Sequence, residues 1–342
     1  MVGSPVESFI THSNYIRAFS TLVGADIQAS PYQIYRDISN RIVQSGCLAS
    51  RSSNAFDDNA VFSSLKNAWG TELLIDMGKH FVDDPELCRL SNNWSIVQLY
   101  YVLYHATQAV ALAKGFLRPT SHPKTLRFFH SFWASRNICL EPWTISYDSQ
   151  GSHNIPSHIT VDDTIHQWSH CSSDTAWSLA CKALKTTRDD KLEEAFKKAR
   201  ANKKQEKLKI LRQKLSEKIN QGKARSILPK VPLPRFTPNE KLYIEGRESP
   251  TTIIDYFYRL RIKTNYVESS MFTDGCKNDD SAIQVRDDLI IVAGSFLLLA
   301  ELTISKILGS TIFNNWINNW TRNNVPSNVT SGIKYRLKIH TE

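Results

Sequence analysis

The sequence predicts a mainly α-helical protein, and three observations support this fold class. First, apolar residues recur at helical spacing in most long segments, as they do over 31–43. Second, residues 96–114 are apolar on nearly every side, which is typical of a helix at the centre of a core. Third, residues 189–221 contain neither proline nor glycine, so one long helix can run through all of them. The hydrophobic fraction of 41% is enough to build a proper core.

Residues 1–90 are expected to form an N-terminal region of several short helices. A helix over 31–43 would bury Ile34, Ile38 and Ile42, which follow one another at intervals of four residues. A second helix over 60–81 has an apolar stripe of the same kind, formed by Val61, Leu65, Trp69, Leu73 and Met77. The chain start has no basic stretch followed by an apolar one, so no secretory signal is expected there.

The stretch 91–135 is expected to form the first half of a helical core. Ser91 to Ser95 supply polar caps, and the apolar helix that follows them is expected to end near Gly115. A shorter helix is expected over 124–133.

The second half of the core is expected over 249–312, with helices at 251–266 and 281–308. The apolar run at 289–300 is about twelve residues long, whereas a membrane span needs about twenty, so we expect a buried core helix and no membrane segment. The remaining residues, 313–342, are expected to be a C-terminal tail with an edge strand at 334–339.

Residues 136–248 are expected to be an insertion between the two halves of the core. The segment 138–160 contains Pro142, Gly151 and Pro156 and is expected to form a small β excursion. Helices are expected over 162–184 and 189–221, the second being narrowly amphipathic and therefore projecting. A stiff proline-rich connector follows, with prolines at Pro229, Pro232, Pro234 and Pro238.

The positive charge of the chain is concentrated in this insertion. The formal net charge is +9, and residues 182–225 carry 16 Lys and Arg against 6 Asp and Glu, so this segment alone has +10 and the rest −1. Such a segment attracts polyanions, and lysines neutralise phosphates without reading bases. We therefore expect nucleic acid, RNA in particular, to bind the cations Lys197, Lys198, Arg200, Lys203, Lys204, Lys207 and Arg212. The alternative is a solvated helix face, since Glu193, Glu194, Glu206 and Glu217 are interspersed.

The segment 255–266 is the stretch that most suggests chemistry. On a helix, Arg259 and Tyr266 lie near one face, while Arg261 and Asn265 lie near another. A guanidinium beside a polar ring or amide can clamp a phosphate, and with a base it can form a ribonuclease site. The alternative is an ordinary solvated helix end that is rich in cations.

Two blocks of sequence together resemble the HEPN superfamily, and its YaaC-like members in particular. The first runs from Leu99 through the aromatic stretch to His105 and on to Ala113-Lys-Gly115. The second runs from Arg259 to Tyr266 and is followed by Met271-Phe272 and a long apolar helix. The resemblance covers about 90 residues and implies a helical bundle, often dimeric. Many members are metal-independent ribonucleases that work in bacterial defence or toxin systems, and other members are scaffolds without catalysis.

In the ribonucleases of this superfamily, an Arg is followed four to six residues later by His. There the His moves protons and the Arg stabilises the charge that develops on the phosphate. Here the expected His position holds Tyr266, whose ordinary pKa of about 10 makes it a poor base at neutral pH. By this resemblance Arg259 and Arg261 would hold the scissile phosphate, and Asn265 and Tyr266 would position the attacking hydroxyl. A His from another helix could replace the missing one, and the candidates are His105, His122 and His130.

The sequence favours neither a cofactor nor a metal site. No phosphate-cradling glycine loop is present, and the six cysteines are scattered without a CxxC pair, as in a cytoplasmic protein with reduced thiols. His166 and His170 lie at i and i+4, but no third ligand follows at a fixed spacing.

Two functional hypotheses result from the sequence. The first is a cytoplasmic HEPN-like protein that handles RNA, either as a metal-independent endoribonuclease or as a degenerate relative. The second is a non-catalytic scaffold that binds a protein partner through the basic insertion, or forms a homodimer. A nuclease would place Arg259 and Arg261 in a cleft beside a His or carboxylate, whereas a scaffold would bury them in salt bridges.

Overall fold

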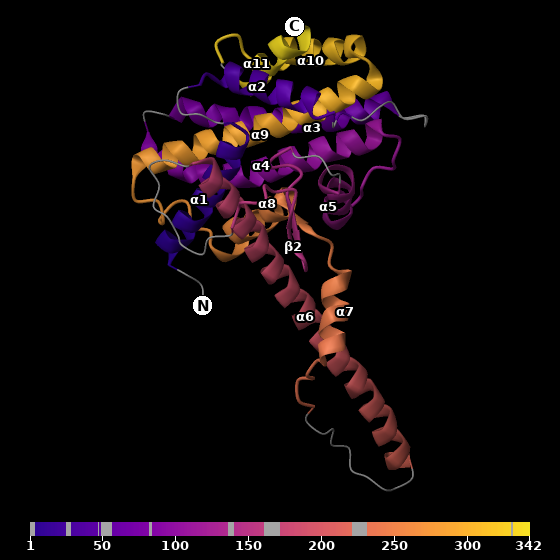
Figure 1. The fold of residues 1–342 in the computed structure, drawn as a ribbon. Coiled ribbons are helices and arrows are strands. Elements are labelled where there is room, and N and C mark those ends of the chain that lie inside the picture. The colour runs from indigo at the N-terminus through magenta and orange to yellow at the C-terminus, as the bar shows by residue number, and fades with distance from the viewer. Residues whose placement is uncertain are drawn as a thin grey trace.

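The computed structural model describes residues 4–24, 29–46, 48, 57–81, 84–135, 140–160, 172–220, 231–329 and 331–342. The described part is mainly helical, which confirms the predicted class (Figure 1). The α-helices are α1 (Pro5–Leu22), α2 (Pro31–Gln44), α3 (Asp58–Asp76), α4 (Pro85–Ala113), α5 (His122–Phe129), α6 (Ser173–Asn220), α7 (Pro238–Arg247), α8 (Ile253–Ile262), α9 (Asp279–Leu308), α10 (Ser310–Asn324) and α11 (Gly332–Thr341). Short 3₁₀ or π segments are η1 (Met77–Phe81), η2 (His130–Ala134) and η3 (Lys263–Val267).

Two long helices, α4 and α9, run side by side through the middle of the body (Figure 1). Every residue of α9 from Leu289 to Ala300 is buried, and the helix packs against α4, α3, α2 and α1. Within the described part of the chain, α9 alone is long and apolar enough to cross a membrane, and 78% of its apolar window is buried inside the fold. The prediction of a buried core helix at 289–300 is therefore confirmed.

The β excursion forms as predicted and gains a third strand from the second half of the core. Strands β1 (Ser146–Asp148) and β2 (Gly151–His153) pair antiparallel, and β1 also pairs antiparallel with β3 (Thr251–Thr252). The order in the sheet is β2-β1-β3. Strand β3 leads directly into α8, so the sheet fixes where α8 begins.

Helix α6 differs from its prediction because the two expected helices are one. It is 48 residues long, which corresponds to about 72 Å at 1.5 Å per residue. Its first part packs on α1, α8 and the sheet, whereas the rest leaves the body with α7 beside it (Figure 1). We call this projecting part, residues 196–220 of α6 together with α7, the arm. The predicted connector forms neither helix nor strand over 231–237, Pro238 begins α7, and Pro229 lies outside the described residues.

Helix α4 also begins earlier than predicted. Its N-cap is Asp84, whose side chain accepts a hydrogen bond from the Leu87 amide, and Pro85 occupies the first turn. The polar residues at 91–95 therefore lie inside the helix, where Asn92 donates to the carbonyl of Ala282 on α9 at 2.7 Å. As a result, the expected boundary at residue 90 falls within a continuous helix.

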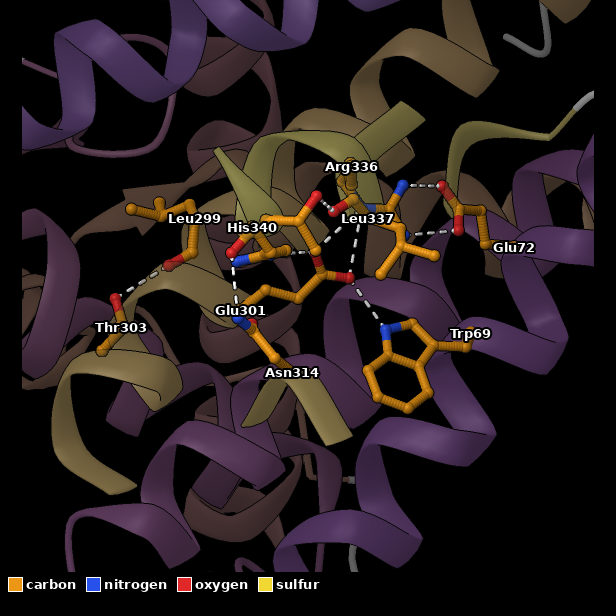
Figure 2. Close-up of polar contacts among 10 residues, drawn as sticks. Trp69, Glu72, Leu299, Glu301, Thr303, Asn314, Arg336, Leu337 and His340 are labelled. Carbon is orange, nitrogen blue, oxygen red and sulfur yellow. Dashed lines mark hydrogen bonds and ion pairs between the residues drawn. The ribbon is translucent and has the colours of Figure 1, made fainter. Parts of the chain in front are cut away.

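The predicted edge strand at 334–339 is wrong, because these residues belong to helix α11. Figure 2 shows the reason: Arg336 points into the core and its Nη atoms donate to both oxygens of Glu72, while its Nε donates to Glu301 at 3.0 and 3.1 Å. Glu301 also accepts from Trp69 at 2.8 Å and contacts His340 at 3.1 Å. The C-terminal segment is thus part of the core, anchored by charges that the sequence pattern does not pair.

Gly294 is required where α9 crosses α2. A Cβ at this position would lie 2.6 Å from Cζ of the buried Tyr35, and the neighbouring atoms cannot yield in a packed core.

We expect Gly294→Ala to destabilise the fold by about 1–3 kcal/mol, although alanine is the better helix former. Gly70→Ala on α3 is the matched control, since a Cβ there meets nothing within 4 Å, and it should stabilise. Urea unfolding midpoints of both variants test this; a stabilised Gly294→Ala protein would contradict it.

Candidate functional site around Arg261

Helix α8 places its two arginines on different sides, because residues two apart on a helix point away from each other. The start of α8 is fixed by Asp255, whose carboxylate accepts hydrogen bonds from the hydroxyl and the backbone amide of the N-cap Thr252 at 2.8 and 2.9 Å. The same carboxylate accepts from Nζ of Lys191 on α6 at 2.9 Å. One side of α8 therefore rests on α6, and the other side faces α4 and α5.

Arg259 lies on the side of α6. Its Nη atoms donate to both oxygens of Glu194 at 2.7 and 3.1 Å, and its Nε lies 3.8 Å from Asp190. The Arg259 side chain is 20% exposed and that of Glu194 is 67% exposed. Arg259 is thus held by acidic partners, which is the arrangement expected of a structural residue.

Arg261 lies on the opposite side, among aromatic rings. Its guanidinium carbon is 5.0, 5.5 and 5.2 Å from the ring centres of Tyr100, Tyr101 and Tyr258, and its Nη1 donates to the Tyr101 hydroxyl at 2.9 Å. Cation–π contacts of this kind hold the guanidinium in place. No described carboxylate pairs with Arg261, and its buried Nε has no described partner. The positive charge of Arg261 is therefore fixed but not neutralised, as in an anion site.

His122, at the start of α5, lies in the same group of rings. Its Nδ1 is 2.6 Å from the Tyr100 hydroxyl, and its ring centre is 4.9 Å from that of Tyr104 and 5.4 Å from that of Tyr258. Burial and the charge of Arg261 lower the pKa of His122 below its ordinary value of 6.5. His122 is thus a neutral base at neutral pH, beside an uncompensated guanidinium. We call Arg261, His122, Tyr100, Tyr101, Tyr104 and Tyr258 the arginine–tyrosine cluster.

The same face of α4 continues from this cluster toward the loop after the helix. The ring of His105 stacks on Tyr101 with centres 6.1 Å apart, and its Nδ1 is buried without a described partner. One turn on, Gln108 donates to the carbonyl of Pro119 at 2.7 Å and accepts from Arg118 at 3.2 and 3.3 Å. Burial and the charge of Arg118 lower the pKa of His105.

The four residues predicted to be catalytic do not converge on one point. Arg261 belongs to the cluster and Arg259 to the contact with α6. Asn265 and Tyr266 lie beyond α8 in the π-helical turn η3, where Asn265 is half-buried and Tyr266 is 80% exposed. The described contacts give Asn265 and Tyr266 no polar partner, so their role in positioning a hydroxyl stays a prediction.

The seven predicted nucleic-acid-binding residues all lie on the arm. Lys203 pairs with Glu240 of α7, and Lys197 pairs with Glu193 at 2.8 Å. Arg200 lies 5.6 Å from the ring centre of Phe236, which also packs on Phe196. The other four form no ion pair with a described residue and are available to a polyanion: Lys198, Lys204, Lys207 and Arg212.

Two other groups of polar residues are less suited to chemistry. The network around Arg336 is fully buried, and no described cavity is lined by its residues. The largest described cavity, about 590 Å³, lies between α1 and α9, and two of its charged lining residues, Arg17 and Asp288, are joined at 3.1 Å. His130 lies apart from Arg261, near Asp255 and Lys191. His166 and His170 lie outside the described residues.

Sequence reasoning included His122 only as one of three histidines that could complete the site. It did not single out Tyr104, Tyr258 or Arg118. A usable signal was present, because Tyr100, Tyr104 and Gln108 follow one another at i+4 spacing and so share one face of α4. What no spacing could provide is the position of α5 relative to that face.

Comparison of the chain with protein-family models, with curated proteins and with solved structures finds no match.

Proposed function

We propose that the protein is a metal-independent endoribonuclease whose active site is the arginine–tyrosine cluster. The observation that carries this proposal is the neutral His122 beside Arg261, a guanidinium without a carboxylate partner. The resemblance to HEPN proteins points to the same chemistry, with His122 of α5 in place of the missing histidine of α8. Dimer formation and a role in bacterial defence belong to the proposal through this resemblance alone, and cytoplasmic location through the scattered cysteines.

In the proposed reaction, His122 accepts a proton from a ribose 2′-hydroxyl. In the tautomer that donates Nδ1–H to the Tyr100 hydroxyl, the lone pair of Nε2 is the proton acceptor. The 2′-oxygen then attacks the adjacent phosphorus, and the bond from phosphorus to the 5′-oxygen breaks. Arg261 stabilises the negative charge on the phosphate oxygens. The 5′-oxygen takes a proton from the imidazolium, which leaves a 2′,3′-cyclic phosphate and a 5′-hydroxyl.

The direct test is incubation of purified protein with labelled RNA in EDTA. Wild type is expected to cleave, and Arg261→Ala is expected to lose about 10²–10³ in rate, as when one donor to a developing charge is removed. Arg259→Ala is the matched control: it removes the same charge from the same helix, but on the side of α6, and should cleave like wild type. Equal losses in both variants would contradict the assignment of Arg261.

The arm supports RNA binding independently of the cluster. Each phosphate that a lysine neutralises adds about 0.7 to the slope of log affinity against log salt for single strands. We therefore expect the triple variant Lys198→Gln, Lys204→Gln, Lys207→Gln to bind RNA more weakly and with a slope smaller by about 2. The control removes three cations from the body, Arg36→Gln, Lys306→Gln and Arg322→Gln. Fluorescence anisotropy at several salt concentrations measures both, and equal slopes would exclude a special role for the arm.

The second candidate is a scaffold that binds a protein partner through the arm. It is favoured by α7, which has no buried residue and exposes Leu242 to 65% and Tyr243 to 66%, near Leu233 at 68%. Exposed apolar side chains of this kind gather at protein interfaces. In the EDTA experiment this candidate predicts no cleavage by the wild type.

A further inference from the structure

Resting on the proposed active site, we propose that Arg118 forms a second phosphate subsite, so that the substrate is single-stranded RNA gripped at two phosphates. Arg118 is exposed, and no described carboxylate pairs with it. Its Nε and Nη2 both donate to Gln108, which is itself fixed by the Pro119 carbonyl. The guanidinium is therefore oriented by a neutral amide and keeps its full charge for a ligand.

The two arginines are anchored at well-separated points on α4, which indicates separate roles. Arg261 bonds Tyr101 and Arg118 bonds Gln108, and these anchors are seven residues apart on α4, about 10 Å along its axis. Guanidinium groups with anchors this far apart suit two phosphates better than one. They can hold two phosphates of the same strand, with the scissile one at Arg261 and His122.

Aromatic rings line the path between the two arginines. Tyr101, Tyr104 and His105 are half-buried and lie between Arg261 and Arg118 on the same face of α4. Rings beside a cationic path are the means by which proteins hold unpaired bases, since each base can stack on a ring. A paired base cannot turn toward such rings, so the arrangement selects single strands.

The test compares substrates with one phosphate and with several. For Arg118→Ala, the KM for a single-stranded RNA hexanucleotide is expected to rise about tenfold, as for loss of one charged hydrogen-bonded contact, with kcat unchanged. For a dinucleoside monophosphate, which has one phosphate, neither constant should change. Arg127→Ala on α5 is the control, because Arg127 is exposed and its Nε bonds only the Pro123 carbonyl among the described groups.

Binding of a DNA hexanucleotide, which lacks the attacking hydroxyl, gives a second measurement that needs no cleavage. Weaker binding by Arg118→Ala but not by Arg127→Ala supports the subsite even if the wild type cleaves nothing, in which case the proposed function alone fails. Cleavage with unchanged KM and DNA affinity in Arg118→Ala overturns the subsite and leaves the function intact. A fall in kcat on both substrates would also overturn it, because Arg118 would then act on the fold of the site.

Discussion

Replacing Arg336 with methionine is expected to cost about 3–5 kcal/mol of unfolding free energy, the usual effect of leaving a buried charge without its partner. Arg336 is fully buried, and its guanidinium holds Glu72 on α3 and Glu301 on α9 together. Burial raises the pKa of Glu72 to about 7. Burial also acts to raise the pKa of Glu301, but the charge of Arg336, with the hydrogen bond from His340, lowers it to about 2. Without Arg336, both carboxyl groups would remain in the core with no guanidinium.

Urea unfolding measures this effect, and two further variants give it a clear interpretation. Arg322→Met on α10 removes an exposed arginine from the same part of the chain and should change little. Adding Glu72→Gln and Glu301→Gln to Arg336→Met removes the stranded charges, so most of the lost stability should return. If the single variant unfolded at the same urea concentration as Arg322→Met, the network would contribute nothing to stability.

Replacing His122 with alanine is expected to slow RNA cleavage by about 10²–10⁴-fold, the range for loss of a positioned general base. The pH dependence provides an independent check. Because burial and the charge of Arg261 lower the pKa of His122, the base form persists below pH 6.5, and the wild-type rate should rise with pH through a midpoint below 6.5 and then level off. In Arg261→Ala one of the two causes is gone, so the midpoint should move upward toward 6.5.

The same titration can be followed without any substrate. The ring signals of selectively labelled histidine report each pKa by NMR, and the spectrum of His122→Ala assigns the relevant signal. Arg259→Ala, whose charge lies on the far side of α8, should leave the His122 midpoint where it is in wild type. An upward shift in Arg259→Ala, or none in Arg261→Ala, would mean that Arg261 does not act on His122.

The parts of the fold that the sequence predicts are those in which local pattern and tertiary packing agree. The stripe Ile34, Ile38 and Ile42 is buried in α2 as expected, and the apolar run of α9 lies in the core. The prediction fails at helix α11 because its inward-facing side chains, Ile333, Arg336 and His340, include two that are polar, one of them an arginine. Only the carboxylates of distant helices make their burial possible, and one sequence does not show such partners.

The candidate site is likewise predictable only in its local features. The segment with Arg259 and Arg261 could be recognised, and their placement on different faces follows from helical spacing. Which arginine is neutralised depends on Glu194 of α6, 65 residues away in the chain. Likewise, His122 is an ordinary helix-start residue until α5 packs against α4 and surrounds it with Tyr100 and Tyr104.

The link between α3 and α11 also has a consequence for synthesis on the ribosome. Glu72 and Arg336 are 264 residues apart, and Glu301 accepts hydrogen bonds from the same guanidinium. Helices α3, α4 and α9 can collapse together as soon as α9 has emerged, but two carboxylates then remain in their interior without a counterion. Helix α11, which follows all three in the chain, supplies that counterion. A nascent chain from which α11 has not yet emerged, or a product that ends before α11, therefore exposes an incompletely paired core to chaperones and proteases.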